Sequence, residues 1–385
     1  MKYYTNTYSG IDNIFDEIFK NNKKLNNKKL NNLKQADFAY VQKFRDIDFN
    51  DFKNIKHFNN FIDPHNQICR TGNYCLGNKS QFYNYFLKYY SKKPKYLPMT
   101  YSFNSNNLLS IRNKFIKNNI WILKPTNSFA RDGITVVNNY KMTQDWIKKN
   151  KKFNQWILQE YIKNPLLYKG KKFHIRFYCL CVKDSNKFEA FKFKNGFFYL
   201  ASEKYSKTDL SLSKHLTGAK YCYVHQVYPD LETFLPNNKF EFILEQADKI
   251  IIDTLSICKD ILGCPNKINS NKGNCFHLFA FDLLADNNYK LHLLEVNNGT
   301  VGMETIDFRP DLCVNKASKK LHNINIIRSL HKDLVTIVTK NDWQNTDFNK
   351  LKLKNLNIIE GFTLQNNHEG ITIILFLLVL LYLVL

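Results

Sequence analysis

Two acidic residues and an amide lie within a short stretch of strand-like sequence and are the first candidates for chemistry. Residues 276–285 and 289–296 flank a DNN sequence that is typical of a β-hairpin turn. Pairing the two strands about this turn puts Asp282 opposite Leu293. Because opposed residues and i, i+2 neighbours share a face, this register projects three polar side chains from one side of the sheet, namely Asp282, Glu295 and Asn297.

The neighbours of these polar residues are mostly Phe, Leu and Val on both faces, which predicts a buried hairpin. Two buried carboxylates are costly unless a cation or hydrogen bonds compensate their charge. A small set of oxygen ligands suits Mg²⁺ that also holds nucleotide phosphates. The alternative is an exposed carboxylate pair near the strand ends, with no metal.

A second stretch, residues 173–182, reads as a long strand whose two faces differ. Its alternation places apolar residues on one side and potentially cationic residues on the other, namely Lys172, His174 and Arg176. Three such groups in a row favour a polyanionic ligand such as a triphosphate. A solvated outer face of an antiparallel sheet is the competing interpretation.

A third candidate is Lys124, which ends a short strand (residues 120–124) and precedes the loop PTNSFARDGI. A lysine beside a loop with Arg131 and Gly133 could cover phosphates. One glycine is a weak signal, and the sequence has no Walker motif.

Further strands are expected at residues 134–137 and 156–162, and a helix at residues 240–262, where apolar residues recur every three or four positions. Several strands follow one another without an intervening helix. The class is therefore α+β rather than a doubly wound parallel sheet.

The composition limits the function classes. The chain has 385 residues, 44% hydrophobic, which is ample for a core, and 56 Lys and Arg against 33 Asp and Glu. The net charge of +23 attracts polyanions, but no RNP, zinc-finger or helix-turn-helix signature is present, so no nucleic-acid partner is expected. None of the nine cysteines forms a CxxC pair, which predicts reduced thiols and no structural zinc.

The last residues, 371–385 (ITIILFLLVLLYLVL), contain no charge. Such a helix would measure roughly 22 Å, which is short for a ~30 Å hydrocarbon core. A buried helix normally keeps a polar stripe, and this segment has none. It is predicted to be a tail anchor, which places the protein on the cytoplasmic face of a membrane; without insertion the protein would lie in the cytoplasm.

Four ordered blocks, WILKPTNSFARDGI, LQEYIKNPLLYKGKKFHIRFYCLC, SLSKHLTG and FAFDLLADNNYKLHLLEVNNG, resemble those of the tubulin–tyrosine ligase family. The resemblance is strongest over residues 121–298. It implies an ATP-grasp fold with N-terminal, central and C-terminal subdomains. The expected organisation is an Asn/Lys-rich region (1–70), the ligase-like domain (71–340), a polar linker (341–369) and the hydrophobic tail (370–385).

The resemblance also implies roles for individual residues. Arg176 and Lys172 match active-site cations, and Asp282, Glu295 and Asn297 match the Mg²⁺ ligands. The ATP site would comprise Lys124, Arg131, Asp132, Gly133, Ile134, Gln159, Glu160, Tyr161, Ile162, Lys172 and His174.

Three positions depart from the family pattern. The aspartate expected two residues after the second lysine is His174, the HLTN block ends in Gly218, and an expected substrate-facing arginine is Tyr199. ATP binding therefore looks better preserved than recognition of the amino acid or acceptor.

The resemblance implies an ATP-dependent ligase that joins a free amino acid to an acidic protein, such as a tubulin C-terminal tail, through an acylphosphate. Glutamate is favoured, with tyrosine or glycine as alternatives. The competing hypotheses are a catalytically weakened, ATP-binding adaptor attached to a membrane and, from charge alone, a nucleic-acid binder.

Overall fold

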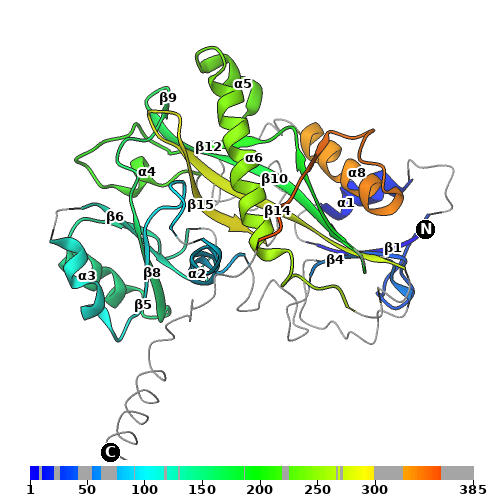
Figure 1. Ribbon diagram of the computed structural model, residues 1–385, viewed down its shortest axis with the longest axis horizontal. Coiled ribbons are helices and arrows are strands. Elements are labelled where there is room, and N and C mark those ends of the chain that lie inside the picture. Colours follow the sequence, from blue (N-terminus) through cyan, green and yellow to red (C-terminus); the bar gives the residue numbers. More distant parts are fainter. Residues whose placement is uncertain are drawn as a thin grey trace, which may run out of the picture.

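The computed structural model describes residues 1–7, 11–20, 27–41, 54–61, 76–90, 92–116, 119–128, 131–185, 187–218, 225–265, 268, 272–298 and 324–356. These residues form a mixed α and β structure with two sheets (Figure 1). The expectation of mixed α and β structure is confirmed.

The larger sheet follows the order β13-β12-β10-β14-β4-β3-β1-β2, and β9, β11, β15 and β16 pair at its sides. Its central strands are antiparallel to one another, while β4 joins β14 in parallel. The strands are β1 (Lys2–Asn6), β2 (Lys28–Lys29), β3 (Phe38–Val41), β4 (His57–Asn59), β9 (Leu167–Tyr168), β10 (Lys171–Lys183), β11 (Phe188–Phe193), β12 (Phe197–Leu200), β13 (His225–Val227), β14 (Asn274–Ala285), β15 (Leu291–Asn297) and β16 (Phe348–Leu351).

The smaller sheet has the order β5-β8-β6-β7 and carries its own core. It consists of β5 (Thr100–Asn104), β6 (Trp121–Pro125), β7 (Thr135–Val137) and β8 (Gln155–Glu160). Helix α3 (Tyr140–Lys149) and the 3₁₀ helix η2 (Leu108–Phe115) pack against it around the buried Trp156. In Figure 1 this sheet lies to one side of the larger one.

The two faces of β10 meet different partners. Its apolar face contacts α6 (Lys239–Cys258) through Phe173, Ile175, Phe177, Cys179 and Cys181. On the other face, Tyr178 and Leu180 pack with α1 (Ile11–Lys20) and α8 (Ile324–Lys340). The amino-terminal half of this second face carries Lys172, His174 and Arg176, and it faces the smaller sheet instead of α1 and α8 (Figure 1).

The remaining helices lie between or beside the sheets. They are α2 (Lys79–Tyr89), α4 (Leu212–His215) and α5 (Tyr228–Phe234). Helix α2 begins with Asn78 as its N-cap, whose side chain accepts hydrogen bonds from the backbone N–H groups of Ser80 and Gln81, both at 3.1 Å.

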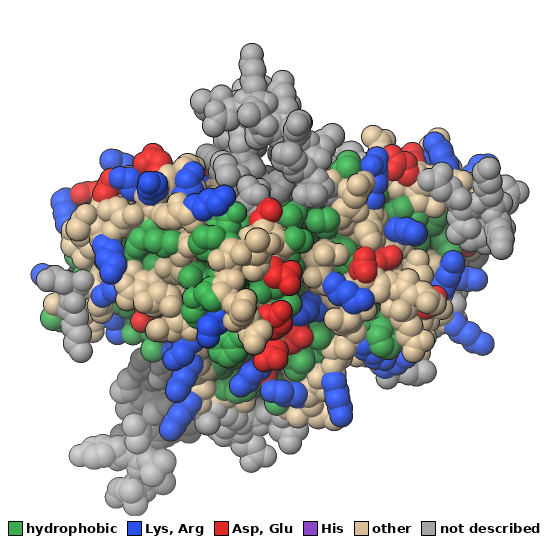
Figure 2. Space-filling model, turned by 90° about the horizontal axis from the view of Figure 1, so that it is seen from above, with side chains coloured by type: hydrophobic (Ala, Val, Ile, Leu, Met, Phe, Trp, Pro, Cys, Tyr) green, Lys and Arg blue, Asp and Glu red, His purple; other side chains and the backbone are tan. Residues whose placement is uncertain are grey.

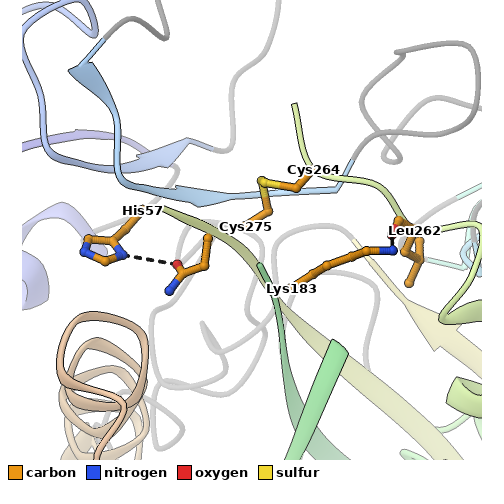
Figure 3. Close-up of a disulfide and its surroundings, with 6 residues drawn as sticks. His57, Lys183, Leu262, Cys264 and Cys275 are labelled. Atoms are coloured by element: carbon orange, nitrogen blue, oxygen red, sulfur yellow. Dashed lines mark hydrogen bonds between the residues drawn. A yellow bond between two sulfur atoms is a disulfide. The ribbon is translucent and has the colours of Figure 1, made fainter. Parts of the chain in front are cut away.

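The prediction that all cysteines are reduced thiols is wrong for one pair. Cys264, which follows α6, forms a disulfide with Cys275 at the start of β14, and their Cα atoms are 5.5 Å apart (Figure 3). Spacing along the sequence did not reveal the pair because the return of the chain from α6 to the sheet brings the two residues together. Cys179, Cys181 and Cys258 are free and buried.

No helix among the described residues is long and apolar enough to cross a membrane. The predicted tail anchor at residues 370–385 lies outside the described residues, so the structure gives this prediction no support.

The surface charge is uneven. Figure 2 shows Lys and Arg side chains over the flanks of one face, with Asp and Glu side chains gathered near its middle. On this face the charge is therefore divided between basic flanks and an acidic middle.

Replacing both Cys264 and Cys275 by Ser should lower the free energy of unfolding by ~2–3 kcal/mol, because the crosslink closes a loop that the unfolded chain would otherwise leave open. Thermal unfolding with and without reductant measures this effect. Reductant should lower the melting temperature of the wild type and leave that of the double variant unchanged. A wild type insensitive to reductant would contradict the prediction.

Candidate active site

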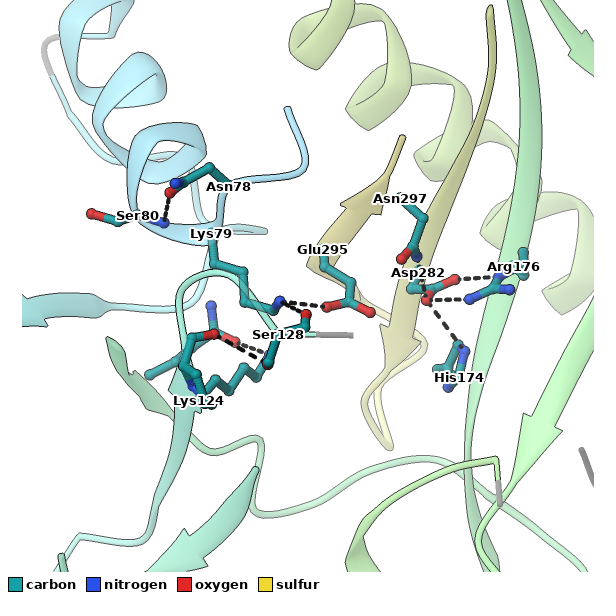
Figure 4. Close-up of polar contacts among 12 residues, drawn as sticks. Asn78, Lys79, Ser80, Lys124, Ser128, His174, Arg176, Asp282, Glu295 and Asn297 are labelled. Atoms are coloured by element: carbon teal, nitrogen blue, oxygen red, sulfur yellow. Dashed lines mark hydrogen bonds and ion pairs between the residues drawn. The ribbon is translucent and has the colours of Figure 1, made fainter. Parts of the chain in front are cut away.

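The central contact of the site joins two neighbouring strands of the larger sheet. Arg176 on β10 donates two hydrogen bonds to Asp282 on β14, from Nε to Oδ1 and from Nη2 to Oδ2, both at 2.8 Å (Figure 4). Burial alone would raise the pKa of the Asp282 carboxyl, but Arg176 holds it below its usual range. The carboxylate therefore stays ionised inside the protein.

The hairpin brings the three predicted oxygen ligands to one face, although its register differs from the prediction. Asp282 lies opposite Glu295 and not opposite Leu293. The turn is shifted by one residue, which alone would move Glu295 to the other face, and a β-bulge at Leu294 adds a second shift of one residue that returns Glu295 to the face of Asp282. Asn297 Nδ2 then donates to Asp282 Oδ2 at 3.0 Å.

Glu295 faces a lysine that the sequence had not singled out. Lys79, the first residue of α2, lies with Nζ 3.8 Å from Glu295 Oε2 and donates to the Ser128 carbonyl at 3.0 Å (Figure 4). Lys79, Gln159 and Glu295 line one pocket.

Lys124 on β6 extends from the smaller sheet. Its Nζ donates to Gln159 Oε1 at 2.9 Å, and Gln159 Nε2 donates to Thr100 Oγ1 at 3.0 Å. Both Lys124 and Gln159 are buried. Three neighbouring strands therefore hold the ammonium group in place.

Lys172 on β10 is held by a different network. Its Nζ donates to the Tyr161 hydroxyl at 2.9 Å and lies 4.1 Å from the centre of that ring. The Tyr161 hydroxyl is 2.6 Å from His215 Nδ1, and His215 Nε2 is 2.7 Å from the Asp209 carbonyl oxygen. Tyr161, which the resemblance assigns to the ATP site, therefore holds a lysine in place.

Both lysines have pKa values below the usual lysine range. Burial lowers the pKa of Lys124 to about 8. Burial, together with the charge of Lys124, lowers the pKa of Lys172 to about 7. The two ammonium groups lack a bonded carboxylate among the described residues, so an incoming anion would stabilise their charged forms.

His174 lies on β10 between Lys172 and Arg176 in sequence, and its Nε2 is 3.7 Å from Asp282 Oδ2 of the hairpin. Its Nδ1 is 2.6 Å from Thr217 Oγ1, and its ring stacks on Tyr199 with the centroids 4.9 Å apart. The Arg176 guanidinium also lies over the Tyr199 ring, at 4.8 Å. Burial lowers the pKa of His174 to about 4, so the imidazole is neutral near pH 7.

The predicted covering loop contacts the block that ends in Gly218. The Arg131 guanidinium donates to the carbonyl oxygens of Gly218 and Leu216, the latter at 3.4 Å. Gly133 has φ +73°, and an added Cβ would lie 2.7 Å from side-chain atoms of Phe153. Both the positive φ and the close approach of Phe153 therefore favour glycine at this position.

Four predicted residues lie away from the charged groups or contact them only through the backbone. Asp132, which is half-buried, pairs with Lys152, and the Ile134 N–H donates to the Arg131 carbonyl. The Glu160 N–H donates to the Met99 carbonyl, and Glu160 Oε2 accepts from the Met99 N–H at 3.3 Å. Ile162 lies two residues after the end of β8.

The fold and these contacts define a mixed α and β protein with a charged site between two sheets, lysines on one side and a carboxylate hairpin on the other. Comparison with known sequences agrees with this class. A model described as the tubulin-tyrosine ligase family matches residues 63–339, and the chain belongs to that family. Its sheets are consistent with an ATP-grasp-like fold.

The identity to individual relatives is low. The chain is 28% identical to the probable tubulin polyglutamylase ttll-9 of Caenorhabditis elegans, over 48% of this chain and 46% of that protein. It is 32% identical to tubulin glycylase 3D of Tetrahymena thermophila, over 47% and 18%. A probable alpha-tubulin polyglutamylase, Ttll1, of the same ciliate is 24% identical over 77% and 70%. The chain thus spans less than half the length of the first two relatives.

Replacing Asp282 by Asn should lower the free energy of unfolding at pH 7 by ~3–5 kcal/mol, because Arg176 would keep a buried and unpaired charge. The folded-state pKa of Asp282 lies below its unfolded value of ~3.9, so the contribution of the pair is present above that pH and is lost below it. Denaturant unfolding at several pH values should show the difference from wild type narrowing below about pH 4. A difference independent of pH would contradict this assignment.

Proposed function

We propose that the protein is an ATP-dependent ligase that adds an amino acid to an acidic protein acceptor. One observation carries the proposal: two buried lysines from different sheets, Lys124 and Lys172, converge with lowered pKa values opposite a carboxylate hairpin. Cations arranged in this way suit the phosphates of ATP. Membership of the tubulin-tyrosine ligase family supports the same assignment.

The hairpin has the donor set that Mg²⁺ prefers. Asp282 and Glu295 are opposed carboxylates on one face, and Asn297 adds an amide beside them. Among the described residues no group of three His, Cys, Asp or Glu side chains is arranged to hold a metal ion, so phosphate oxygens and water would complete its coordination. A bound Mg²⁺ would neutralise phosphate charge.

In the proposed reaction the acceptor carboxylate attacks the terminal phosphate of ATP, and ADP leaves. The amine of the amino acid then attacks the acylphosphate carbon and releases phosphate. The protein positions the reactants and offsets moving negative charge, and it needs no covalent nucleophile. Lys124 and Lys172 would bind phosphates, with Gln159 and Tyr161 holding them in place. Arg176, fixed by Asp282, would orient the transferred group.

The amino acid is proposed to be glutamate, with glycine as the alternative, because relatives are named polyglutamylases and glycylases. The acceptor is proposed to be a tubulin tail, whose acidity suits a chain with net charge +23.

A second candidate function is an ATP-binding protein that has lost ligation. Tyr199 supports it, because its ring contacts both His174 and Arg176 at a position where the family pattern has an arginine. Both candidates bind ATP. They differ in ligation, because the second candidate would join no amino acid to tubulin.

Mass spectrometry of tubulin incubated with the protein, ATP, Mg²⁺ and mixed amino acids tests the proposal. Wild type should add glutamate or glycine to tail peptides. Glu295→Gln should abolish the addition with little loss of fold, because it removes a charge aimed at the metal. Glu17→Gln, at an exposed ion pair with Arg328 on the far helices, is the matched control and should keep wild-type activity. Wild-type activity in Glu295→Gln would refute the hairpin as the metal site.

The affinity for a non-hydrolysable ATP analogue should depend on pH. Lys172, with a pKa of about 7, must regain a proton when phosphate binds, so affinity should be highest below pH 7 and fall as the pH rises. Lys172→Met should weaken binding ~10-fold or more through the lost charge-assisted contact. In that variant the fall should begin near pH 8, where Lys124 titrates.

Calorimetry over about 2.5 pH units, from about pH 6.5 to about pH 9, covers the pKa values of both lysines and measures how the affinity depends on pH. Lys141→Ala, which changes an exposed lysine paired with Asp145, is the control and should bind like wild type. A flat profile in wild type would show that neither lysine contacts phosphate.

A further inference from the structure

His174 is a buried side chain, and only one of its two ring nitrogens makes a hydrogen bond among the described residues. The residue is 8% exposed, and its Nε2 has no hydrogen-bond partner among the residues that the structure describes. The same atom lies 3.7 Å from Asp282 Oδ2 (Figure 4). Because a buried polar atom without a partner costs free energy, this nitrogen calls for an explanation.

The orientation of the ring is fixed by its neighbours. Stacking on Tyr199 sets the ring plane, and the short contact from Nδ1 to Thr217 Oγ1 occupies the opposite nitrogen. Metal-binding histidines show this arrangement: one nitrogen donates its N–H to a nearby oxygen, and the other keeps a lone pair for the metal. A metal ligand at this position requires Nδ1–H to donate to Thr217 Oγ1, which leaves the lone pair of Nε2 directed toward Asp282.

The separation of the two atoms fits ligands of one ion. An ion held ~2.1 Å from a nitrogen and from a carboxylate oxygen separates those atoms by ~3.0–3.5 Å, so a shift of a few tenths of an ångström suffices. Arg176 and Asn297 already donate to Asp282, and further cations lie nearby. A cation would therefore enter with the phosphates of a nucleotide and not alone.

We propose that His174 and Asp282 form a mixed nitrogen and oxygen site for a divalent transition-metal ion that enters with the nucleotide. An imidazole ligand favours such ions over Mg²⁺, which prefers oxygen ligands. The inference rests on the proposed function, since the nucleotide supplies the remaining ligands.

Mn²⁺ with a non-hydrolysable ATP analogue is the probe, and the full chain is the sample. Pulsed electron paramagnetic resonance should detect ¹⁴N coupling to bound Mn²⁺ in wild type. Protein labelled with ¹⁵N-histidine should change that signal. In competition, Mg²⁺ should displace Mn²⁺ poorly from the wild-type complex.

His174→Asp replaces the nitrogen with oxygen. It should abolish the nitrogen coupling and lower the preference for Mn²⁺ over Mg²⁺ by about tenfold, while the analogue still binds with Mg²⁺. Thr217→Val, which removes the partner of Nδ1, should weaken Mn²⁺ binding ~10-fold or more. His292→Asn is the matched control, because His292 and Asp286 form another His–Asp pair, at 3.2 Å, in the hairpin turn. It should change nothing.

Binding of the analogue without ¹⁴N coupling in wild type would overturn this inference and leave the proposed function intact. Coupling that survives in folded His174→Asp would overturn it as well. If His174→Asp does not fold, two other measurements test the inference: the signal of the ¹⁵N-histidine-labelled wild type and the Mn²⁺ affinity of Thr217→Val. An unchanged signal on labelling, or an unchanged affinity in Thr217→Val, would overturn it. Absence of analogue binding under any metal would instead refute the proposed function.

Discussion

The buried pair of Arg176 and Asp282 is the interaction on which the rest of the site depends. It joins the two longest strands of the larger sheet at the point where the covering helices α1 and α8 no longer reach. Two matched hydrogen bonds compensate the loss of hydration that burial imposes on both charges. The fixed carboxylate then sets the position of Asn297, and the fixed guanidinium lies over Tyr199.

The two lysines near this pair are held in place without carboxylate partners among the described residues. Lys124 and Lys172 are held by neutral oxygens of Gln159 and Tyr161, and burial works against their charged forms. A protein that needed only stability would gain from apolar side chains at these positions. Positive groups kept in place by costly burial, next to carboxylates on the facing hairpin, are what a site for a metal-bound polyphosphate requires.

The sequence predicted the elements better than the contacts between them. The strand and helix patterns of β6, β8, β10, β14 and α6 were readable, because each has a clear apolar period. The hairpin register was wrong by one residue at the turn, and the bulge at Leu294 was not foreseen. Each of these two features shifts the pairing by one residue, and a total shift of two leaves the same side chains on the same face. The shared face of Asp282 and Glu295 was therefore predicted correctly from a register that was wrong.

Contacts between distant segments had no local signal. Lys79, the link from Lys172 through Tyr161 to His215, and the disulfide of Cys264 all depend on how far-apart elements pack. The polar face of β10 could equally have been a solvated surface by alternation alone. Only the position of the smaller sheet distinguishes a binding face from a solvated surface, and the periodicity of the sequence does not predict that position.

Hydrogen–deuterium exchange with and without a non-hydrolysable ATP analogue and Mg²⁺ tests most directly the central claim that a nucleotide binds between the two sheets. Protection should appear on both sides of the site, in β6 and β8 of the smaller sheet and in β15 and the 215–218 block of the larger one. The distant helices α1 and α8 should exchange as before. Protection limited to one sheet, or centred on α1 and α8, would contradict the account.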